Sequence, residues 1–276
     1  MNISYHAWND YQECPKKYFL RYKQKLPSPE PENEYFTLYG KLTEKFFQMF
    51  SNIWRFSMPY MPPEEIRFKL NKLYEEILRV TPVDWTASFV KYSKEEIFEQ
   101  AFNDVYVIMD SLNQNYFFST QAEVSLTVVT KDANITGRLD FVHKDAISKA
   151  VMIFDGKGTD KIGKNVKNDQ LLFYALLYYL HSKILPEKLG FFYYRFNTYI
   201  PVPLSLDILN EFRAKLASSI SKMVTDIEFK ASPCYKSCKY CDYQSICLEC
   251  QKSRADNRKA PKIELPDQNG PIEFGF

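Results

Sequence analysis

Two aspartates and a lysine in the middle of the chain have the residue types and spacing that metal-assisted hydrolysis needs. Asp140 lies in ITGRLDFVH, and Asp155 and Lys157 lie in IFDGKGT. Carboxylate oxygens and a backbone carbonyl, here that of Gly156, suit Mg²⁺ or Mn²⁺. Such a cation lowers the pKa of a bound water and stabilises charge on a phosphate oxygen, while Lys157 can position that water or support the transition state. These residues outline metal-dependent phosphodiester hydrolysis.

The same residues also have a simpler interpretation, as strand-end carboxylates in loops or surface ion pairs, because D-x-K is common by chance. Gln170 and Tyr174 favour the functional interpretation. They are spaced i, i+4 on a predicted helix, so they share a face and could hold a phosphate or a metal-bound water near the site. Without the pattern of Asp140, Asp155 and Lys157, the pair would be interpreted as an ordinary polar residue and an aromatic residue at a helix margin.

Five of the six cysteines fall in CYKSCKYCDYQSICLEC, residues 234–250, and the sixth is Cys14. The start, MNISYHAWND, has no signal-peptide pattern, and no apolar run is long enough to span a membrane. We therefore expect an intracellular protein with reduced thiols, where clustered cysteines more often bind metal than form disulfides. One arrangement, C-x2-C-x5-C-x2-C, would close a zinc site and leave Cys14 as a buried thiol; its members are Cys238, Cys241, Cys247 and Cys250.

Composition limits the classes of protein without choosing among them. The chain has 276 residues and 45% hydrophobic content, enough for one large core. Its 36 basic and 34 acidic residues give a net charge of +2, so a nucleic-acid site has to come from local clusters of charge.

Hydrophobic periodicity supplies the elements that would position these residues. The first 115 residues predict helices at 4–12, 40–56, 62–80 and 93–114. The period then changes to two, which predicts strands at 122–130, 135–143 and 149–157, then a helix at 167–183, a strand at 188–196 and a helix at 205–229. This order indicates a mixed α/β core preceded by a helical insertion. If the second and third strands pair antiparallel, Asp140 and Asp155 converge at one end of the sheet.

Six segments keep the order and rough spacing of a known family: SYHAWNDYQECPKKYFLRY, GKLTE, ITGRLDFV, IFDGKGT, DQLLFYALL and CKYCDYQSIC. From about residue 3 to residue 250 the chain resembles the RecB-type nucleases of the PD-(D/E)XK superfamily. It is most similar to their iron-sulfur branch, which includes the AddB nuclease domain and the CRISPR-adaptation nucleases. The resemblance implies a restriction-endonuclease-like α/β fold with a mixed central sheet flanked by helices.

The resemblance also implies a role for each matching residue. Asp140, Asp155 and the Gly156 carbonyl would be metal ligands, and Lys157 the catalytic lysine. The pair on the helix after the core strands would be Gln170 and Tyr174. Glu123 matches an acidic position that the family often has on its first core strand.

The chain departs from the family pattern at one position. The family's first motif reads Gly, three residues, His, with the histidine as a metal ligand, whereas Gly40 is followed at that spacing by Glu44. A glutamate is a competent ligand for a hard cation, so Glu44 can serve with an altered metal preference. The alternative is a site that has lost its activity.

The resemblance gives the cysteines a second arrangement, in which one cysteine before the core joins three after it. Cys14, Cys238, Cys241 and Cys247 would hold a structural 4Fe-4S cluster that staples the N-terminal helix to the C-terminal segment. Cys234 and Cys250 have no role in this arrangement.

The predicted organisation is a single nuclease domain over residues 1–250 and a flexible tail over 251–276. The domain comprises a helical insertion (35–118), a catalytic core (119–230) and a cysteine-rich segment (231–250) that closes on Cys14. The tail ends in PIEFGF, which could dock on a helicase, recombination or single-strand-binding partner.

The implied function is a Mg²⁺- or Mn²⁺-dependent exonuclease that acts on single-stranded DNA ends. It would serve recombination, repair, replication or CRISPR adaptation, without a membrane partner, in the cytoplasm (the host cytoplasm if the source is viral). The alternatives are an inactive DNA-end-binding scaffold and a zinc-stabilised interaction protein.

Overall fold

The computed structural model describes residues 1–28, 35–56, 62–114, 120–145, 148–159, 162–163 and 167–259. The chain divides into two compact units. The first comprises Met1–Asn9 and Glu30–Ile227, and the second comprises Asp10–Pro29 and Glu228–Phe276. The boundary falls within helix α1 (Tyr5–Glu13). Each unit therefore joins segments from opposite parts of the sequence.

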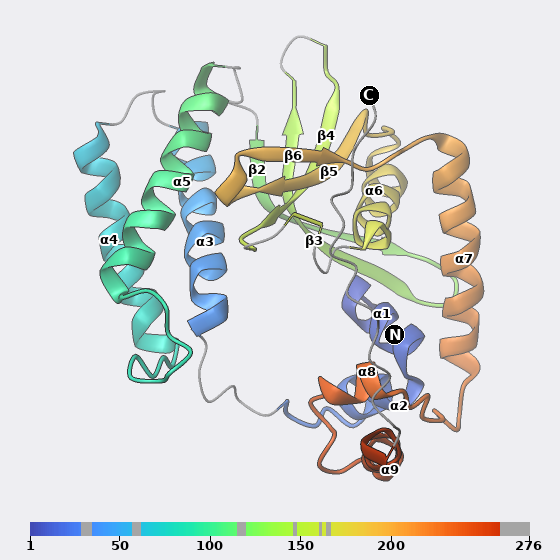
Figure 1. Ribbon diagram of the computed structural model, residues 1–276. Coiled ribbons are helices and arrows are strands. Elements are labelled where there is room, and N and C mark those ends of the chain that lie inside the picture. Colours follow the sequence, from blue (N-terminus) through green and yellow to red (C-terminus); the bar gives the residue numbers. More distant parts are fainter. Residues whose placement is uncertain are drawn as a thin grey trace, which may run out of the picture. The chain divides into compact units, whose positions relative to one another are not determined.

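A mixed sheet forms the centre of the first unit (Figure 1). Its strands are β1 (Asn2–Ile3), β2 (Thr120–Val129), β3 (Asn134–Lys144), β4 (Val151–Lys157), β5 (Lys188–Tyr193) and β6 (Thr198–Pro201). The order is β1-β3-β4-β5-β6, and β2 also pairs with β3. β3 is antiparallel to β2 and to β4, while β4 and β5 are parallel. The predicted mixed α/β fold with a central sheet is confirmed.

The strands differ from the sequence prediction at the end of β5. The predicted strand 188–196 stops at Tyr193, and a 3-10 turn covers Tyr194–Phe196 before Asn197 takes a left-handed conformation (φ 42°). The chain then returns as β6, which the sequence did not predict. It is short, lies at the sheet edge and ends in Pro201, so it carries little of the alternating signal of a strand.

Helices cover the sheet within the first unit (Figure 1). The insertion consists of α3 (Tyr35–Phe56), α4 (Pro63–Val80) and α5 (Lys94–Gln114), and α6 (Asn168–Ser182) and α7 (Leu206–Thr225) follow the core strands. Leu42, Phe46 and Phe47 of α3 are buried in one cluster with Phe141 and Phe154 of the sheet, which fixes the insertion against the core. No described helix is long and apolar enough to cross a lipid bilayer.

The second unit has little regular structure. It contains α2 (Pro15–Tyr18), a π-helical segment (Phe19–Lys23), α8 (Tyr235–Lys239) and α9 (Leu248–Lys259). Pro15 occupies the first turn of α2, where its missing N–H is tolerated, and Cys14 is extended between α1 and α2. An ion pair from Arg21 to Asp242 ties the two segments of this unit together, and Arg21 also pairs with Asp10 in its own segment.

The segment directly after residue 250 differs from the sequence prediction. Residues 251–259 belong to α9, although the absence of periodicity suggested a flexible segment from 251. This stretch contains no glycine or proline and is rich in good helix formers, so it is helical without a wide apolar face. Residues 260–276, including PIEFGF, lie outside the described residues.

Candidate active site

Strand register brings Asp140 and Asp155 together. β3 and β4 pair from Lys144 opposite Val151 to Phe141 opposite Phe154, and one further step in this register sets Asp140 against Asp155. The pairing ends there, while β4 continues beside β5 as far as Lys157. The predicted antiparallel pairing is confirmed, and the two carboxylates face each other where β3 and β4 separate.

Asp155 is held by two neighbours. Its Oδ1 accepts a hydrogen bond of 2.8 Å from Nε2 of Gln170, and its Oδ2 pairs with the ammonium of Lys157. Asp155 is only 1% exposed, so both neighbours offset the cost of burying its charge. Tyr174 hydrogen-bonds with Gln170, and burial raises its pKa to about 12. The helical pair predicted from sequence therefore meets the strand carboxylates.

Glu44 lies close enough to interact with the strand carboxylates. Burial raises the pKa of Glu44, and the negative charges of Glu123 and Asp155 add to the effect. Burial, followed by the charges of Asp155 and Glu44, raises the pKa of Asp140 to about 8. This concentration of buried negative charge is a common feature of sites that receive a cation.

A close helix–strand contact positions Glu44. A Cβ atom on Gly158 would lie 3.0 Å from the Cα of Gly40 and 3.1 Å from the ring of Tyr39. Glycine at 158 thus lets the chain beyond β4 approach α3. Glu44 follows Gly40 by about one helical turn, which turns its carboxylate toward the strand carboxylates. It also accepts a 3.2 Å hydrogen bond from Gln48.

Glu123 joins the site from β2, at a break in the strand pairing. It has a positive φ of 51° and is skipped in the β2–β3 register, between Ala122 opposite Phe141 and Val124 opposite Leu139. Its Oε1 is 3.1 Å from the guanidinium of Arg138. That oxygen and Oδ2 of Asp155 make ion pairs yet accept no well-directed hydrogen bond. Both oxygens retain the capacity to bind a further ligand.

Sequence reasoning missed Tyr194, which lies against the predicted metal ligand Gly156. Its hydroxyl oxygen is 1.7 Å from the position that a Cβ on Gly156 would occupy. Burial, then the charges of Asp140 and Asp155, raise the pKa of Tyr194 far above its ordinary value. A usable signal was the position of Tyr194 directly after β5, because β4 and β5 are parallel and their carboxyl ends meet at one sheet edge.

The oxygen-rich donor set suits a hard cation. Among the described residues, no three His, Cys, Asp or Glu side chains are grouped tightly enough to hold a metal ion as they stand. The ammonium of Lys157, paired with Asp155, supplies positive charge to the cluster. Oδ2 of Asp155, a buried carboxylate oxygen without a directed hydrogen bond, is what such a cation would engage, so the residues fit Mg²⁺ or Mn²⁺ by chemistry.

Comparison with known proteins agrees with this geometry. The family model of the PD-(D/E)XK nuclease superfamily matches residues 2–248. The chain belongs to that superfamily. An exonuclease candidate from Eubacterium rectale shares its fold, at 13% identity over 92% of this chain and 88% of that chain, with a TM-score of 0.51.

A second solved structure, SSO0001, aligns at 15% identity over 90% of this chain and 85% of that chain. Its TM-score of 0.38 is too low to carry an argument. No curated protein matches the sequence.

Five of the six cysteines of this superfamily member line one small cavity in the second unit: Cys14, Cys238, Cys241, Cys247 and Cys250. Cys234 is the exposed N-cap of α8 and does not line it. The iron-sulfur arrangement left both Cys234 and Cys250 unassigned, and the structure separates them. Burial, followed by the three other C-terminal thiols of the cavity, raises the pKa of Cys250 to about 12.

The cysteines of the cavity match the donor type of a zinc or a 4Fe-4S centre. The cavity has a volume of about 30 Å³. Among the described residues, no group of three or more His, Cys, Asp or Glu is placed to hold a metal ion. Four thiolates are the donor set of both centres. The family match ends at residue 248, so it includes Cys14 and excludes Cys250.

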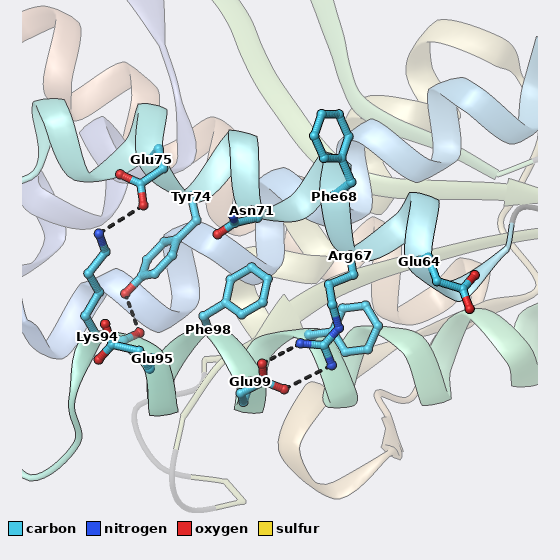
Figure 2. Close-up of a pocket in the computed structure, with 11 residues that line it drawn as sticks. Glu64, Arg67, Phe68, Asn71, Tyr74, Glu75, Lys94, Glu95, Phe98 and Glu99 are labelled. Atoms are coloured by element: carbon cyan, nitrogen blue, oxygen red, sulfur yellow. Dashed lines mark hydrogen bonds and ion pairs between the residues drawn. The ribbon is translucent and has the colours of Figure 1, made fainter.

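A larger cavity, of about 670 Å³, lies between α4 and α5 (Figure 2). Arg67 pairs with Glu99 across it, and Lys94 reaches Glu75 at 2.9 Å. Phe68 of α4 is 70% exposed at this cavity. None of the predicted catalytic or ligand residues lines it, so it is separate from the carboxylate site.

Proposed function

We propose that this protein is a Mg²⁺- or Mn²⁺-dependent deoxyribonuclease, and specifically an exonuclease acting on single-stranded DNA ends. The observation that carries the proposal is the pair of buried carboxylates, Asp140 and Asp155, at the point where β3 and β4 separate, with Lys157 and Gln170 on Asp155. The preference for ends is supported by the family resemblance and by the description of the Eubacterium rectale protein as an exonuclease candidate.

In the proposed reaction, Glu44, Asp140, Asp155 and the carbonyl of Gly156 would hold the cation. When bound, the cation would lower the pKa of the attacking water and offset charge on the phosphate. Lys157 donates a hydrogen bond to that water or to a phosphate oxygen, because it lies two residues beyond Asp155 on the same strand.

The helical pair acts on the orientation of these groups. Gln170 fixes the rotamer of Asp155 through its 2.8 Å hydrogen bond. Tyr174 in turn holds the amide of Gln170. A carboxylate oriented in this way needs little reorganisation when it meets its ligand, which is how a second layer of residues supports a metal site.

We further propose a structural 4Fe-4S cluster held by Cys14, Cys238, Cys241 and Cys247. Their common cavity and the resemblance to the iron-sulfur branch of the family support this set. The biological process would be recombination, repair, replication or CRISPR adaptation. A helicase, recombination or single-strand-binding partner would bind through the tail, whose residues 260–276 lie outside the described part of the chain.

The test is digestion of end-labelled single-stranded and duplex DNA by anaerobically purified protein with Mg²⁺ or Mn²⁺. We expect the wild type to degrade DNA and both Asp155→Ala and Lys157→Ala to be slower by about 1000-fold. Asp169→Ala and Lys215→Ala are matched controls, because these residues form an exposed ion pair at 2.6 Å and should leave activity unchanged.

The opposite result would also be informative. If the wild type and both site variants are equally inert in either metal while still binding DNA, the nuclease proposal is wrong. The protein would then be a DNA-end-binding scaffold, with Glu44 marking the loss of activity.

A further inference from the structure

Tyr194 has a buried hydroxyl that packing alone does not explain. The residue is 3% exposed, and its ring stacks on Phe47 with centroids 5.0 Å apart. Among the residues that the structure describes, its hydroxyl has no hydrogen-bond partner. A phenylalanine would fill the same space without burying an unsatisfied polar atom, which is costly in a protein interior.

Other buried tyrosines near this region do find partners in the protein. The hydroxyl of Tyr39 donates to Asp104, that of Tyr74 donates to the carbonyl of Lys94 at 3.0 Å, and that of Tyr193 accepts from the N–H of Gly163 at 3.0 Å. The fold therefore generally satisfies such groups. Tyr194 and Tyr199 are exceptions among the described residues, and of these two only Tyr194 lies beside the carboxylate site. Its position there points to a partner that is not part of the polypeptide.

The surroundings of this hydroxyl indicate what that partner is. The oxygen lies over Gly156, and the nearby charged groups are the carboxylates of Asp140, Asp155 and Glu44. Oδ2 of Asp155 is also without a directed hydrogen bond. The Tyr194 hydroxyl is thus a hydrogen-bond donor that lies near carboxylate acceptors without bonding to them. This arrangement is expected around a hydrated cation, because its waters can accept from the hydroxyl and donate to the carboxylates.

We propose that the Tyr194 hydroxyl is a hydrogen-bond donor of the active site, which holds an oxygen atom brought in by the hydrated cation or by the phosphodiester. The proposal rests on the proposed nuclease function and adds a residue to it. Gly156 is then required for two reasons. Its carbonyl serves the cation, and its lack of a side chain leaves room for the hydroxyl.

Tyr199 offers a matched control within the same unit. Its hydroxyl is also buried without a partner, and its ring lies over another glycine, Gly190, with Cζ 2.4 Å from the position of a Cβ there. Burial alone raises the pKa of Tyr199, to about 12, whereas carboxylate charges contribute at Tyr194. The two tyrosines thus share a buried hydroxyl, although the rest of Tyr199 is only partly buried, and they differ in their proximity to the acidic residues.

The experiment compares Tyr194→Phe with Tyr199→Phe in the full chain, by Mn²⁺ titration without DNA, single-turnover DNA cleavage and thermal unfolding. Both variants should unfold at the wild-type temperature or above it, because each loses an unsatisfied buried hydroxyl. Only Tyr194→Phe should lose function, by about 10-fold or more. A loss of Mn²⁺ affinity without DNA identifies the oxygen as a water of the cation, whereas a loss confined to cleavage identifies a phosphate oxygen.

Equal Mn²⁺ binding and equal cleavage by Tyr194→Phe and Tyr199→Phe would overturn the inference while leaving the nuclease proposal intact. A wild type that neither binds Mn²⁺ nor cleaves DNA would instead contradict the proposed function itself. Asp155→Ala separates these cases, since it should abolish Mn²⁺ binding whenever the site is functional.

Discussion

The carboxylate site and the cysteine site both gather residues from distant parts of the sequence, but they are supported differently. In the first unit, strand register and the hydrogen bond from Gln170 hold Asp155. In the second unit, short helical segments carry the cysteines around a cavity of about 30 Å³. The comparison teaches that the fold builds the carboxylate site, whereas the proposed centre at the cysteine site would itself help to stabilise its unit.

The largest expected effect is loss of the second unit when a cavity cysteine is removed. Cys241→Ser should eliminate the bound centre and lower the free energy of unfolding by at least about 5 kcal/mol, because binding energy is folding energy in a unit with so small a core. Metal analysis, visible absorbance and limited proteolysis measure this. Cys234→Ser is the control, since Cys234 does not line the cavity. If Cys241→Ser and Cys234→Ser are equally stable, the cysteine site does not stabilise the second unit.

The next prediction concerns which cysteine, Cys14 or Cys250, supplies the fourth thiolate ligand of the centre. Cys14→Ser should lose iron and the brown colour, while Cys250→Ser should keep both, if the cluster joins the two segments of the unit. The reverse result, with zinc bound and no visible absorbance, would assign the centre to the four C-terminal cysteines. Iron and zinc analysis of both variants distinguishes the two arrangements.

At the carboxylate site, removing a ligand should have the opposite effect on stability. Asp140→Asn should reduce cleavage by about 1000-fold yet stabilise the metal-free protein at pH 7 by about 1 to 3 kcal/mol. The buried Asp140 carboxyl has its pKa raised to about 8, so folding at pH 7 carries the cost of protonating it, and asparagine removes that cost. Chemical denaturation in the presence of a chelator measures the gain. Asp169→Asn, at an exposed ion pair, should change neither quantity. A lower free energy of unfolding for Asp140→Asn than for the wild type would mean that the carboxylate site also stabilises its unit.

Glu44 tests how far the carboxylate site tolerates a change of ligand. Glu44→Ala should lower cleavage by about 10- to 100-fold, because Asp140, Asp155 and Gly156 remain. Glu44→His restores the family pattern and should recover most of the activity, with a changed ratio of rates in Mn²⁺ and Mg²⁺. Activity of Glu44→Ala equal to that of the wild type would exclude Glu44 from the ligand set.

The smallest effects are expected at the two glycines that bring α3 to β4. Gly40→Ala should stabilise the protein by about 0.5 to 1 kcal/mol, since its Cβ would meet no atom within 4 Å and alanine favours the helix. Gly158→Ala should destabilise it by about 1 to 3 kcal/mol, because its Cβ would lie 3.0 Å from the backbone of Gly40. Equal thermal midpoints would argue against the close contact that positions Glu44.

Much of the first unit could be predicted because its signals are local. The apolar run of β4 ends in Asp155, Gly156 and Lys157, and the alternation of β3 includes Asp140, so pairing the two strands was enough to bring the carboxylates together. The i, i+4 spacing of Gln170 and Tyr174 likewise fixed their common face. The short strand β6 and the helical residues 251–259 were missed, because neither has the periodicity of its class.

The sequence by itself determined the chemistry available to this protein: the hard oxygen ligands, the lysine beside them, and a cluster of thiols with one distant member. Only the tertiary structure decided which groups meet. It set Cys250 in the cavity and left Cys234 outside, and it directed the hydroxyl of Tyr194 to Gly156 across parallel strands. Residue type and spacing follow from local sequence. Which side chains lie close together depends on contacts between segments that are far apart in the chain.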